Sequence, residues 1–199
     1  MGSLDDIWFV RHGQSAANAG LATDHPSSIP LTELGRSQAQ AFADNLTVEP
    51  QWIAVSPFQR TSETAFPTVC KFPNVPVHVW PIQELTYLSP VRCKGTKASE
   101  RQVWAKEYWE RLDPLYIDGE GAESYAQFVQ RLEHFEQLLR TTRGFGIVFG
   151  HGMFLKGFLV AREHKFDISP ENMLRFRTVE SQSPLKNVEI TPFSRLLLP

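Results

Sequence analysis

The chain has 199 residues and a formal net charge of −2; 42% of its residues are hydrophobic and 21% are charged. This length suits one domain with a full hydrophobic core, so we expect residues 1–199 to form a single domain. A near-neutral chain lacks the broad positive field on which nucleic-acid binding relies. No apolar run approaches the roughly 20 residues of a membrane span. The composition therefore predicts a globular protein that binds neither nucleic acid nor membranes.

Two features bear on the cellular compartment. The two cysteines, Cys70 and Cys93, are too few for a disulfide framework or a zinc site, so we expect ordinary thiols. The N-terminus has no basic segment followed by an apolar one, which a secretory signal would have. We therefore expect a cytoplasmic protein.

Short apolar runs indicate buried strands. The first of them, residues 7–10, is continuous rather than alternating, which is typical of a strand that is covered on both faces. Four such runs occur in chain order: residues 7–10, 52–55, 75–80 and 145–149. The tail, residues 181–199, has room for one or two more short strands.

Helical periodicity separates these runs. Apolar residues recur at helical spacing from Thr32 to about residue 46, and again over residues 124–140. Ser56 and Pro57 fit the start of a helix that reaches about residue 69, because serine caps helices and proline suits the first turn. Another helix begins near Met153. This alternation predicts an α/β fold, a three-layer sandwich whose mostly parallel central sheet has helices on both faces.

Residues 88–120 are less regular, and we expect them to form an insertion on the substrate side of the domain. They combine cations with aromatic rings: Arg92, Lys94, Lys97, Arg101, Trp104, Lys106, Tyr108 and Trp109. This combination can bind single-stranded nucleic acid. We favour instead a cap whose rings pack on the domain and whose cations could contact an anionic substrate.

Polar clusters follow three of the predicted strands, at the end where ligands bind in open α/β sheets. The clusters are Arg11-His12-Gly13, Ser56 to Arg60, and Gly150-His151-Gly152. Arginine forks match phosphate oxygens, and glycines let a ligand approach backbone N–H groups. The helix near Met153 would point its N-terminal dipole at an anion. The sequence therefore predicts a site for a phosphoryl group or another small tetrahedral anion.

His12 could act as a nucleophile in such a site. The ordinary pKa of histidine, about 6.5, leaves much of it neutral at pH 7, and a neutral imidazole can attack phosphorus. The leaving alkoxide then needs a proton, and Glu84, just beyond the third predicted strand, is placed to donate it and later to accept one from water. Glu63, Glu100 and Glu107 are other carboxylates that could do so.

These residues resemble the signature of the histidine phosphatase superfamily, in its phosphoglycerate-mutase-like branch. The run from Phe9 to Ser15, followed by Asn18, is similar to its opening motif. Further similar segments occur in the family's order: Leu31 to Ala39, Ser56 to Ala65, Glu84-Leu85, Gly121 to Ser124 with Arg131, and Gly150-His151-Gly152. An ordered set of this length is far more specific than the tripeptide Arg-His-Gly alone.

The resemblance implies a role for each matching residue. His12 would carry the phosphoryl group, and Glu84 would be the general acid and base. Further residues would bind the phosphoryl group: Arg11, Arg60, His151, Asn18, Gly13 and Gly152. No organic cofactor is implied. We also expect no metal, because neither His12 nor His151 is followed by a second histidine or carboxylate at ligand spacing.

The segment after Glu84 departs from the pattern of the family's mutases. Mutases are usually longer and carry a tyrosine and paired glycines there, whereas this chain has Leu85-Thr86-Tyr87-Leu88. We therefore expect a phosphatase that acts on a small phosphorylated metabolite or on a phosphorylated protein side chain. A mutase, and a module that binds a phosphorylated ligand without turnover, remain alternatives. The sequence predicts neither the substrate nor the oligomeric state.

Overall fold

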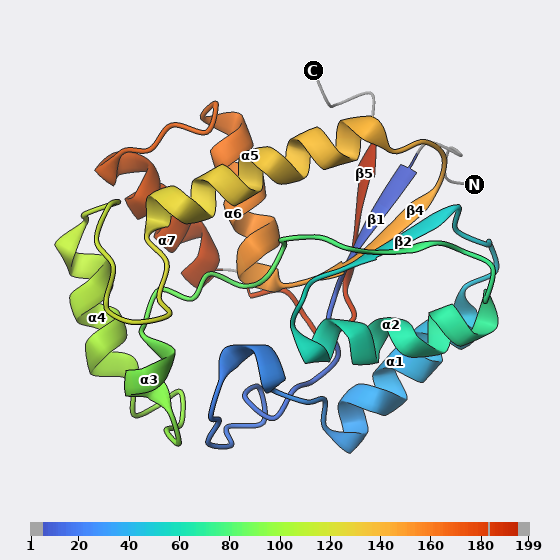
Figure 1. The fold of residues 1–199 in the computed structure, drawn as a ribbon, viewed down its shortest axis with the longest axis horizontal. Coiled ribbons are helices and arrows are strands. Elements are labelled where there is room, and N and C mark those ends of the chain that lie inside the picture. Colours follow the sequence, from blue (N-terminus) through green and yellow to red (C-terminus); the bar gives the residue numbers. More distant parts are fainter. Residues whose placement is uncertain (1–5, 183, 195–199) are drawn as a thin grey trace.

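The structure is a computed structural model that describes residues 6–182 and 184–194. Residues 1–5, on which the expectation about a secretory signal rests, and residues 195–199 of the predicted tail lie outside this range. A five-stranded sheet forms the middle layer, with α1 (Glu33–Asn45) and α2 (Gln59–Lys71) on one face and α5 (Tyr125–Thr141) and α6 (Gly152–Glu163) on the other (Figure 1). The predicted α/β sandwich is confirmed.

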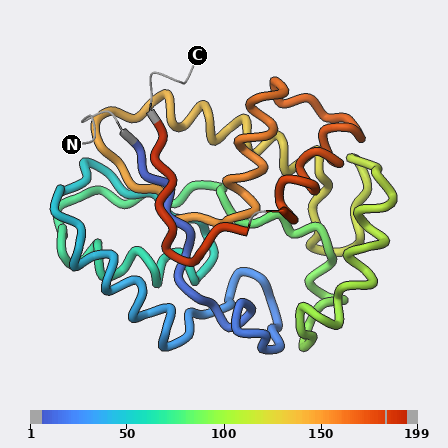
Figure 2. The backbone as a smooth tube through the Cα atoms, turned by 180° about the vertical axis from the view of Figure 1, so that it is seen from behind, coloured from blue at the N-terminus to red at the C-terminus, as the bar shows by residue number. Residues whose placement is uncertain are grey.

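The strand order is β3-β2-β4-β1-β5. The strands β1 (Asp6–Arg11), β2 (Trp52–Val55), β3 (Val77–Val79) and β4 (Gly146–Gly150) run parallel. The C-terminal strand β5 (Ile190–Ser194) lies antiparallel beside β1, as Figure 2 shows from behind. The sheet is therefore mostly parallel, as predicted, and the tail supplies one strand among the described residues.

The register of this sheet fixes where the polar clusters lie. Arg11 of β1 is level with Gly150 of β4, and Val55 of β2 is level with Phe149 of β4. The chain therefore leaves β1, β4 and β2 at the same edge. The residues that follow directly are His12, His151 and Ser56.

Two apolar clusters hold the layers together. One lies between the sheet and α1 and α2, and includes Val10, Ile53 and Phe149. The larger one lies under α5 and α6, and it also contains Tyr108 and Trp109 from the segment 88–120. These two rings are almost fully buried. The expectation that aromatic rings of this segment pack on the domain is thus confirmed for both.

Several elements differ from the sequence-based expectations. The third strand spans only Val77–Val79 and is exposed, because β3 is an edge strand. The segment 88–120 contains two helices, α3 (Pro90–Cys93) and α4 (Gln102–Arg111). The periodicity did not predict α7 (Pro170–Gln182), which buries only three side chains, or the short 3-10 helix η1 (Pro26–Ser28).

Ser56 is the clearest correction among the helix starts. We expected it to cap α2, but the helix begins at Gln59 and its N-cap position is Phe58, which has no side-chain cap. The Ser56 hydroxyl accepts from the Phe58 N–H at 3.1 Å and faces the sheet edge instead. By contrast, Thr32 and Ser124 cap α1 and α5, with side chains that accept from Gly35 N and Gln127 N.

The length and composition of these helices bear on membrane insertion. None of those in the described part of the chain combines the length and the apolar character that crossing a bilayer requires.

A close backbone contact joins the loop after His12 to the first turn of α1. A Cβ at Gly35 would lie 2.1 Å from Gln14 O, and one at Gly13 would lie 2.6 Å from Gly35 O. Both obstacles are backbone atoms, so a side chain at either position requires the two segments to separate.

Replacing Gly35 should therefore destabilise the protein. We expect Gly35→Ala to lower the free energy of unfolding by about 1–3 kcal/mol, because the added methyl group overpacks a backbone contact. Urea denaturation measures this, with Ser37→Ala on the exposed side of the same helix as the control. A Gly35→Ala variant as stable as Ser37→Ala would contradict the contact.

Candidate active site

His12 lies directly after β1 and is almost fully buried. Its Nδ1 atom is 2.7 Å from Gly13 O. A carbonyl oxygen can only accept, so Nδ1 carries the proton and Nε2 presents its lone pair. Arg60 Nε donates to this Nε2 atom at 3.1 Å. The ring is thus held as one tautomer, with its basic nitrogen facing a guanidinium group.

Burial also keeps the His12 ring uncharged. Desolvation lowers the pKa of His12 well below its ordinary value, and the nearby positive charge of Arg60 lowers it further. The Gly13 carbonyl opposes this shift because it stabilises the proton on Nδ1, while Arg11 adds to it. At neutral pH the Nε2 lone pair is therefore available for attack.

His151 follows β4 and is fully buried, and its Nε2 atom lies 2.7 Å from Ser56 Oγ. Ser56 Oγ also lies 3.0 Å from the Thr61 hydroxyl, which has the carbonyls of Ser56 and Phe58 as further acceptors. The Ser56 hydroxyl can donate to His151 Nε2 or accept from it, so this contact orients the ring in either tautomer.

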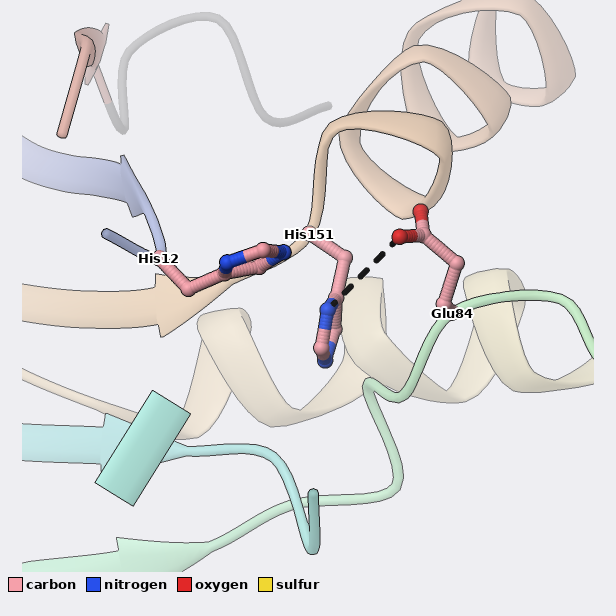
Figure 3. A group of neighbouring side chains, drawn as sticks. All are labelled: His12, Glu84 and His151. Carbon is pink, nitrogen blue, oxygen red and sulfur yellow. Dashed lines mark ion pairs between the residues drawn. The ribbon is translucent and has the colours of Figure 1, made fainter. Parts of the chain in front are cut away.

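The other ring nitrogen of His151 faces Glu84. His151 Nδ1 is buried without a hydrogen-bond partner among the described residues, 3.8 Å from Glu84 Oε2 (Figure 3). Desolvation lowers the pKa of His151 well below its usual range, and the charges of Arg60 and the neighbouring His12 lower it further. A proton or hydrogen-bond partner that reaches this ring must come to Nδ1, on the pocket side.

Arg60 connects the two histidines with the acidic side of the site. Its guanidinium donates to Pro26 O at 2.8 Å in addition to His12, and its Nη2 atom lies 3.7 Å from Glu84 Oε2. Burial lowers the pKa of Arg60 to about 10, with Glu84 opposing the shift. Arg60 therefore remains protonated at neutral pH and supplies a buried positive charge.

Arg11 ends β1 on the other side of His12. One of its terminal nitrogens donates to Leu185 O, and its Nε atom is buried with no hydrogen-bond partner among the described residues. A Cβ on Gly152, the first residue of α6, would lie 3.6 Å from Arg11 Cδ. The Arg11 side chain therefore lies beside the N-terminus of α6 with an unused donor.

Glu84 faces the same helix end from the loop after β3. Its Oε1 atom accepts from Met153 N at 2.8 Å, where the helix dipole favours negative charge. Its side chain is 27% exposed, so it contacts both the buried rings and the solvent. The three other candidate carboxylates lie elsewhere: Glu63 accepts from Leu31 N, Glu100 accepts from Lys97 N, and Glu107 is exposed.

The loop that carries Glu84 is held by a pair of charged residues, Glu123 and Arg131. Arg131 of α5 donates to Pro81 O at 2.9 Å and to Gln83 O at 3.0 Å. Arg131 also pairs with Glu123 at 2.5 Å, and Glu123 accepts from Thr86 N at 3.1 Å. The pair therefore fixes the loop on both sides of Glu84.

The three remaining expected residues differ in their surroundings. Gly13 N donates to Thr64 Oγ1 at 3.0 Å, so the protein itself uses this N–H. Asn18 is exposed, and its Oδ1 atom accepts from Ser15 N and from Asn187 Nδ2. Gly152 opens α6 beside Arg11.

Asn187 is a site residue that the sequence did not suggest. Its Nδ2 atom donates to His12 O at 2.9 Å and to Asn18 Oδ1 at 3.2 Å. The residue lies in the tail, 175 positions from His12 in the sequence. No motif or periodic pattern distinguishes an asparagine in such a segment.

A metal ion is the alternative ligand for this cluster. His12, Glu84 and His151 each offer one ligand atom, and these atoms lie within 4.8 Å of one another. However, both nitrogens of His12 already face protein partners, and Arg60 places a positive charge beside them. A cavity of about 200 Å³ lined by Arg11, Glu84 and Gly152 adjoins the cluster. The charges favour an anion over a cation in this position.

The two uncharged rings should make stability depend on pH. Below about pH 6.5 the unfolded chain protonates both histidines while the folded site does not, so stability falls as the pH falls. We expect a loss of up to about 1.4 kcal/mol per pH unit for each ring below pH 6.5, measured by urea denaturation in phosphate-free buffer. The double variant His12→Asn/His151→Asn should show a shallower dependence.

The exposed pair His78→Asn/His134→Asn provides the matched control and should keep the wild-type dependence on pH. Equal slopes for both double variants would show that the buried rings are not held uncharged.

Most of the chain, including the residues of this site, matches a known protein family. The sequence profile of the histidine phosphatase superfamily (branch 1) matches residues 7–191. The adenosylcobalamin/alpha-ribazole phosphatase of Salmonella typhimurium is 29% identical over 133 residues, which cover 63% of this chain and 63% of that protein. The chain thus matches less than two thirds of the length of this curated relative.

Solved structures share the fold over nearly the whole chain. A putative alpha-ribazole-5′-P phosphatase from Escherichia coli has a TM-score of 0.70 at 22% identity, covering 96% of this chain and 90% of that one. A mycobacterial glucosyl-3-phosphoglycerate phosphatase has a TM-score of 0.67 at 23% identity, covering 94% and 92%. With the profile match over residues 7–191, the protein belongs to the histidine phosphatase superfamily, branch 1.

Proposed function

We propose that this protein is a phosphatase that hydrolyses phosphomonoesters through a phosphohistidine on His12. The observation that carries the proposal is the lone pair of His12 Nε2, which is held in one tautomer, uncharged, and beside Arg60. A nucleophile of this kind needs no base to remove a proton before it attacks. The family membership supports the same chemistry.

In the first step, His12 Nε2 forms a bond to phosphorus as the bond from phosphorus to the ester oxygen breaks. Arg60 transfers its hydrogen bond from Nε2 to a phosphoryl oxygen, and the unused Nε donor of Arg11 binds another. The positive charge that develops on the ring is stabilised by the Gly13 carbonyl at Nδ1. Glu84 gives its proton to the leaving oxygen.

In the second step, water attacks phosphorus and the bond to Nε2 breaks. Glu84 now takes a proton from that water, and His12 recovers its lone pair as inorganic phosphate leaves. The position of Glu84 supports both transfers, because the carboxylate lies next to the phosphoryl-binding groups and still contacts solvent. Asn18 and Gly152 are proposed to bind the phosphoryl oxygens as well.

The wider assignment rests on several supports. Relatives named as phosphatases favour hydrolysis of small phosphorylated substrates over mutase activity. Two free thiols, Cys70 and Cys93, fit a reducing compartment, and we propose a cytoplasmic location. The burial of Tyr108 and Trp109 in the main core supports one domain over residues 1–199, with 88–120 as its insertion.

Removal of the nucleophile tests the proposal directly. We expect wild-type protein to release p-nitrophenol from p-nitrophenyl phosphate and His12→Ala to be slower by more than about a thousandfold, because no phosphohistidine can form. His134→Ala, an exposed histidine on α5, should keep wild-type activity. Equal release by wild type and His12→Ala would sink the proposal.

The role of Glu84 predicts a dependence on the leaving group. With an alkyl phosphate, Glu84→Gln should lower kcat/KM by about 10²–10⁴, because this ratio reports the first step, in which the alkoxide must receive a proton as it leaves. With p-nitrophenyl phosphate the loss should be much smaller, since p-nitrophenolate leaves without one. Exposed Glu107→Gln is the control. An equal loss with both substrates would mean that Glu84 is not the acid.

The pair that holds the Glu84 loop should act through Glu84. We expect the double variant Glu123→Gln/Arg131→Met to lower kcat/KM roughly tenfold to a hundredfold with alkyl phosphates and less with p-nitrophenyl phosphate, because the carboxyl loses its position. The matched control is Glu136→Gln/Arg162→Met, an ion pair away from the site. A uniform loss with both substrates would indicate a merely structural role.

A further inference from the structure

A pocket of about 370 Å³ extends from Arg60 and Glu84 toward α3 and α4. This volume falls within the range of about 300–1,000 Å³ that is typical of small-molecule sites. The pocket begins at the carboxyl group that would protonate the leaving oxygen. If the proposed function is correct, the leaving group of the substrate lies here.

The walls of the pocket are largely apolar. Phe58, Leu85 and Leu88 line it and are each less than 10% exposed, and Pro90 and Ala105 line it as well. Tyr87 completes one side, and its ring packs 5.0 Å from Tyr108 and 5.1 Å from Trp109, measured between ring centroids. The pocket therefore has a fixed aromatic side, supported by the main core.

The other cations that line the pocket, Arg101 and Arg177, make contacts within the protein. Arg101 Nε and Nη2 donate to oxygen atoms of Thr23, Cys93 and Thr96 at 2.7–3.5 Å, so this residue ties the insertion to the N-terminal loop. Arg177 pairs with Glu180 at 2.5 Å and lies over the ring of Trp109.

Two other cations of the insertion are also paired. Arg92 binds Asp118 at 3.0 Å and lies over Trp104, and Lys106 pairs with Glu110 at 3.6 Å. Neither is among the residues that line this pocket.

We propose that this pocket selects phosphomonoesters of uncharged, largely apolar alcohols, such as those with an aromatic ring, over esters whose leaving group carries a carboxylate. The proposal rests on the proposed function for the position of the phosphoryl group. The match lies in the apolar walls, against which a carboxylate would lose part of its hydration, and in the hydrogen bonds that Arg101 and Arg177 already make within the protein.

Phosphonates test this selectivity without depending on turnover, because their carbon–phosphorus bond is not hydrolysed. Calorimetry on the wild-type protein should show 2-phenylethylphosphonate binding at least tenfold more tightly than 2-carboxyethylphosphonate. Equal or tighter binding of the carboxyethyl compound would overturn the proposal.

A filled pocket supplies the second test. Ala105→Phe should weaken binding of 2-phenylethylphosphonate at least fivefold and leave binding of methylphosphonate unchanged, because only the larger ligand enters the pocket. Val103→Phe, two residues away on the exposed side of α4, is the matched control and should change neither. Ala98→Phe, at the exposed rim of the same pocket, serves as a second filling variant should Ala105→Phe not fold. Unchanged binding in the filled variants would place the leaving group elsewhere.

Turnover separates this inference from the proposed function. Hydrolysis of 2-phenylethyl phosphate and 3-phosphoglycerate, both esters of an alkyl alcohol, should favour the phenylethyl ester at least tenfold in kcat/KM. No hydrolysis of either ester above the His12→Ala level would overturn the phosphatase proposal, while the phosphonate preference would still support the pocket. Equal hydrolysis of both esters would overturn the selectivity and leave the phosphatase proposal standing.

Discussion

Two imidazole rings lie buried beside two guanidinium groups, and this arrangement is stable only while both rings are uncharged. Burial and the arginine charges lower the pKa of His12 and of His151 for the same reasons. An uncharged ring has two tautomers, so the protein must also choose where its single proton lies. The Gly13 carbonyl makes the choice for His12, and the Ser56 hydroxyl engages Nε2 of His151. Each ring thus presents one nitrogen to the site, Nε2 of His12 and Nδ1 of His151.

The regular register of the sheet brings these groups together. Parallel strands in register place His12 and His151 at one edge, where the main chain of His12 still bonds to Gly150 at 3.0 Å. Arg60 then comes from the second residue of α2. Glu84 is the exception, since it lies on an irregular loop. That loop has acquired its own supports, with Arg131 and Glu123 bonding to its backbone on both sides of Glu84. Of the proposed catalytic residues, the one whose position depends least on the sheet thus has a loop that side chains hold in place.

The sequence predicted the parts of the site that follow from strand ends. Continuous apolar runs located β1, β2 and β4, and the rule about carboxyl ends of parallel strands then brought His12, Arg60 and His151 to one edge. It could not predict contacts that depend on side-chain direction. Ser56 looked like a helix cap because Ser-Pro is typical of helix starts, yet its hydroxyl bonds to His151.

Other elements were not predicted because their sequences contain few regularly spaced apolar residues. Asn187 reaches His12 from a segment without periodicity. The helix α7 buries only Asn172, Met173 and Phe176, too few for an amphipathic stripe. The edge strand β3 is shorter than its apolar run because nothing covers its side chains. Spacing along the chain also gave no sign that His12, Glu84 and His151 place possible metal-ligand atoms within 4.8 Å of one another, since separation in the sequence says nothing about separation in space.

The position of Glu84 links the binding of substrate to the chemistry that follows. In the unliganded site its carboxylate lies within 4 Å of Arg60 and His151 and bonds to the first turn of α6, so it faces the same positive groups that a phosphoryl dianion would bind. A dianion that arrives there competes with Glu84 for these groups, while the ester oxygen of the substrate comes to lie beside the carboxyl group. In the proposed mechanism Glu84 gives a proton to that oxygen and takes one from the attacking water in the second step. One side chain can serve both steps because the leaving oxygen and the attacking water occupy the same side of phosphorus, opposite Nε2 of His12. The bonds of Arg131 and Glu123 to the loop hold the carboxyl group on that side.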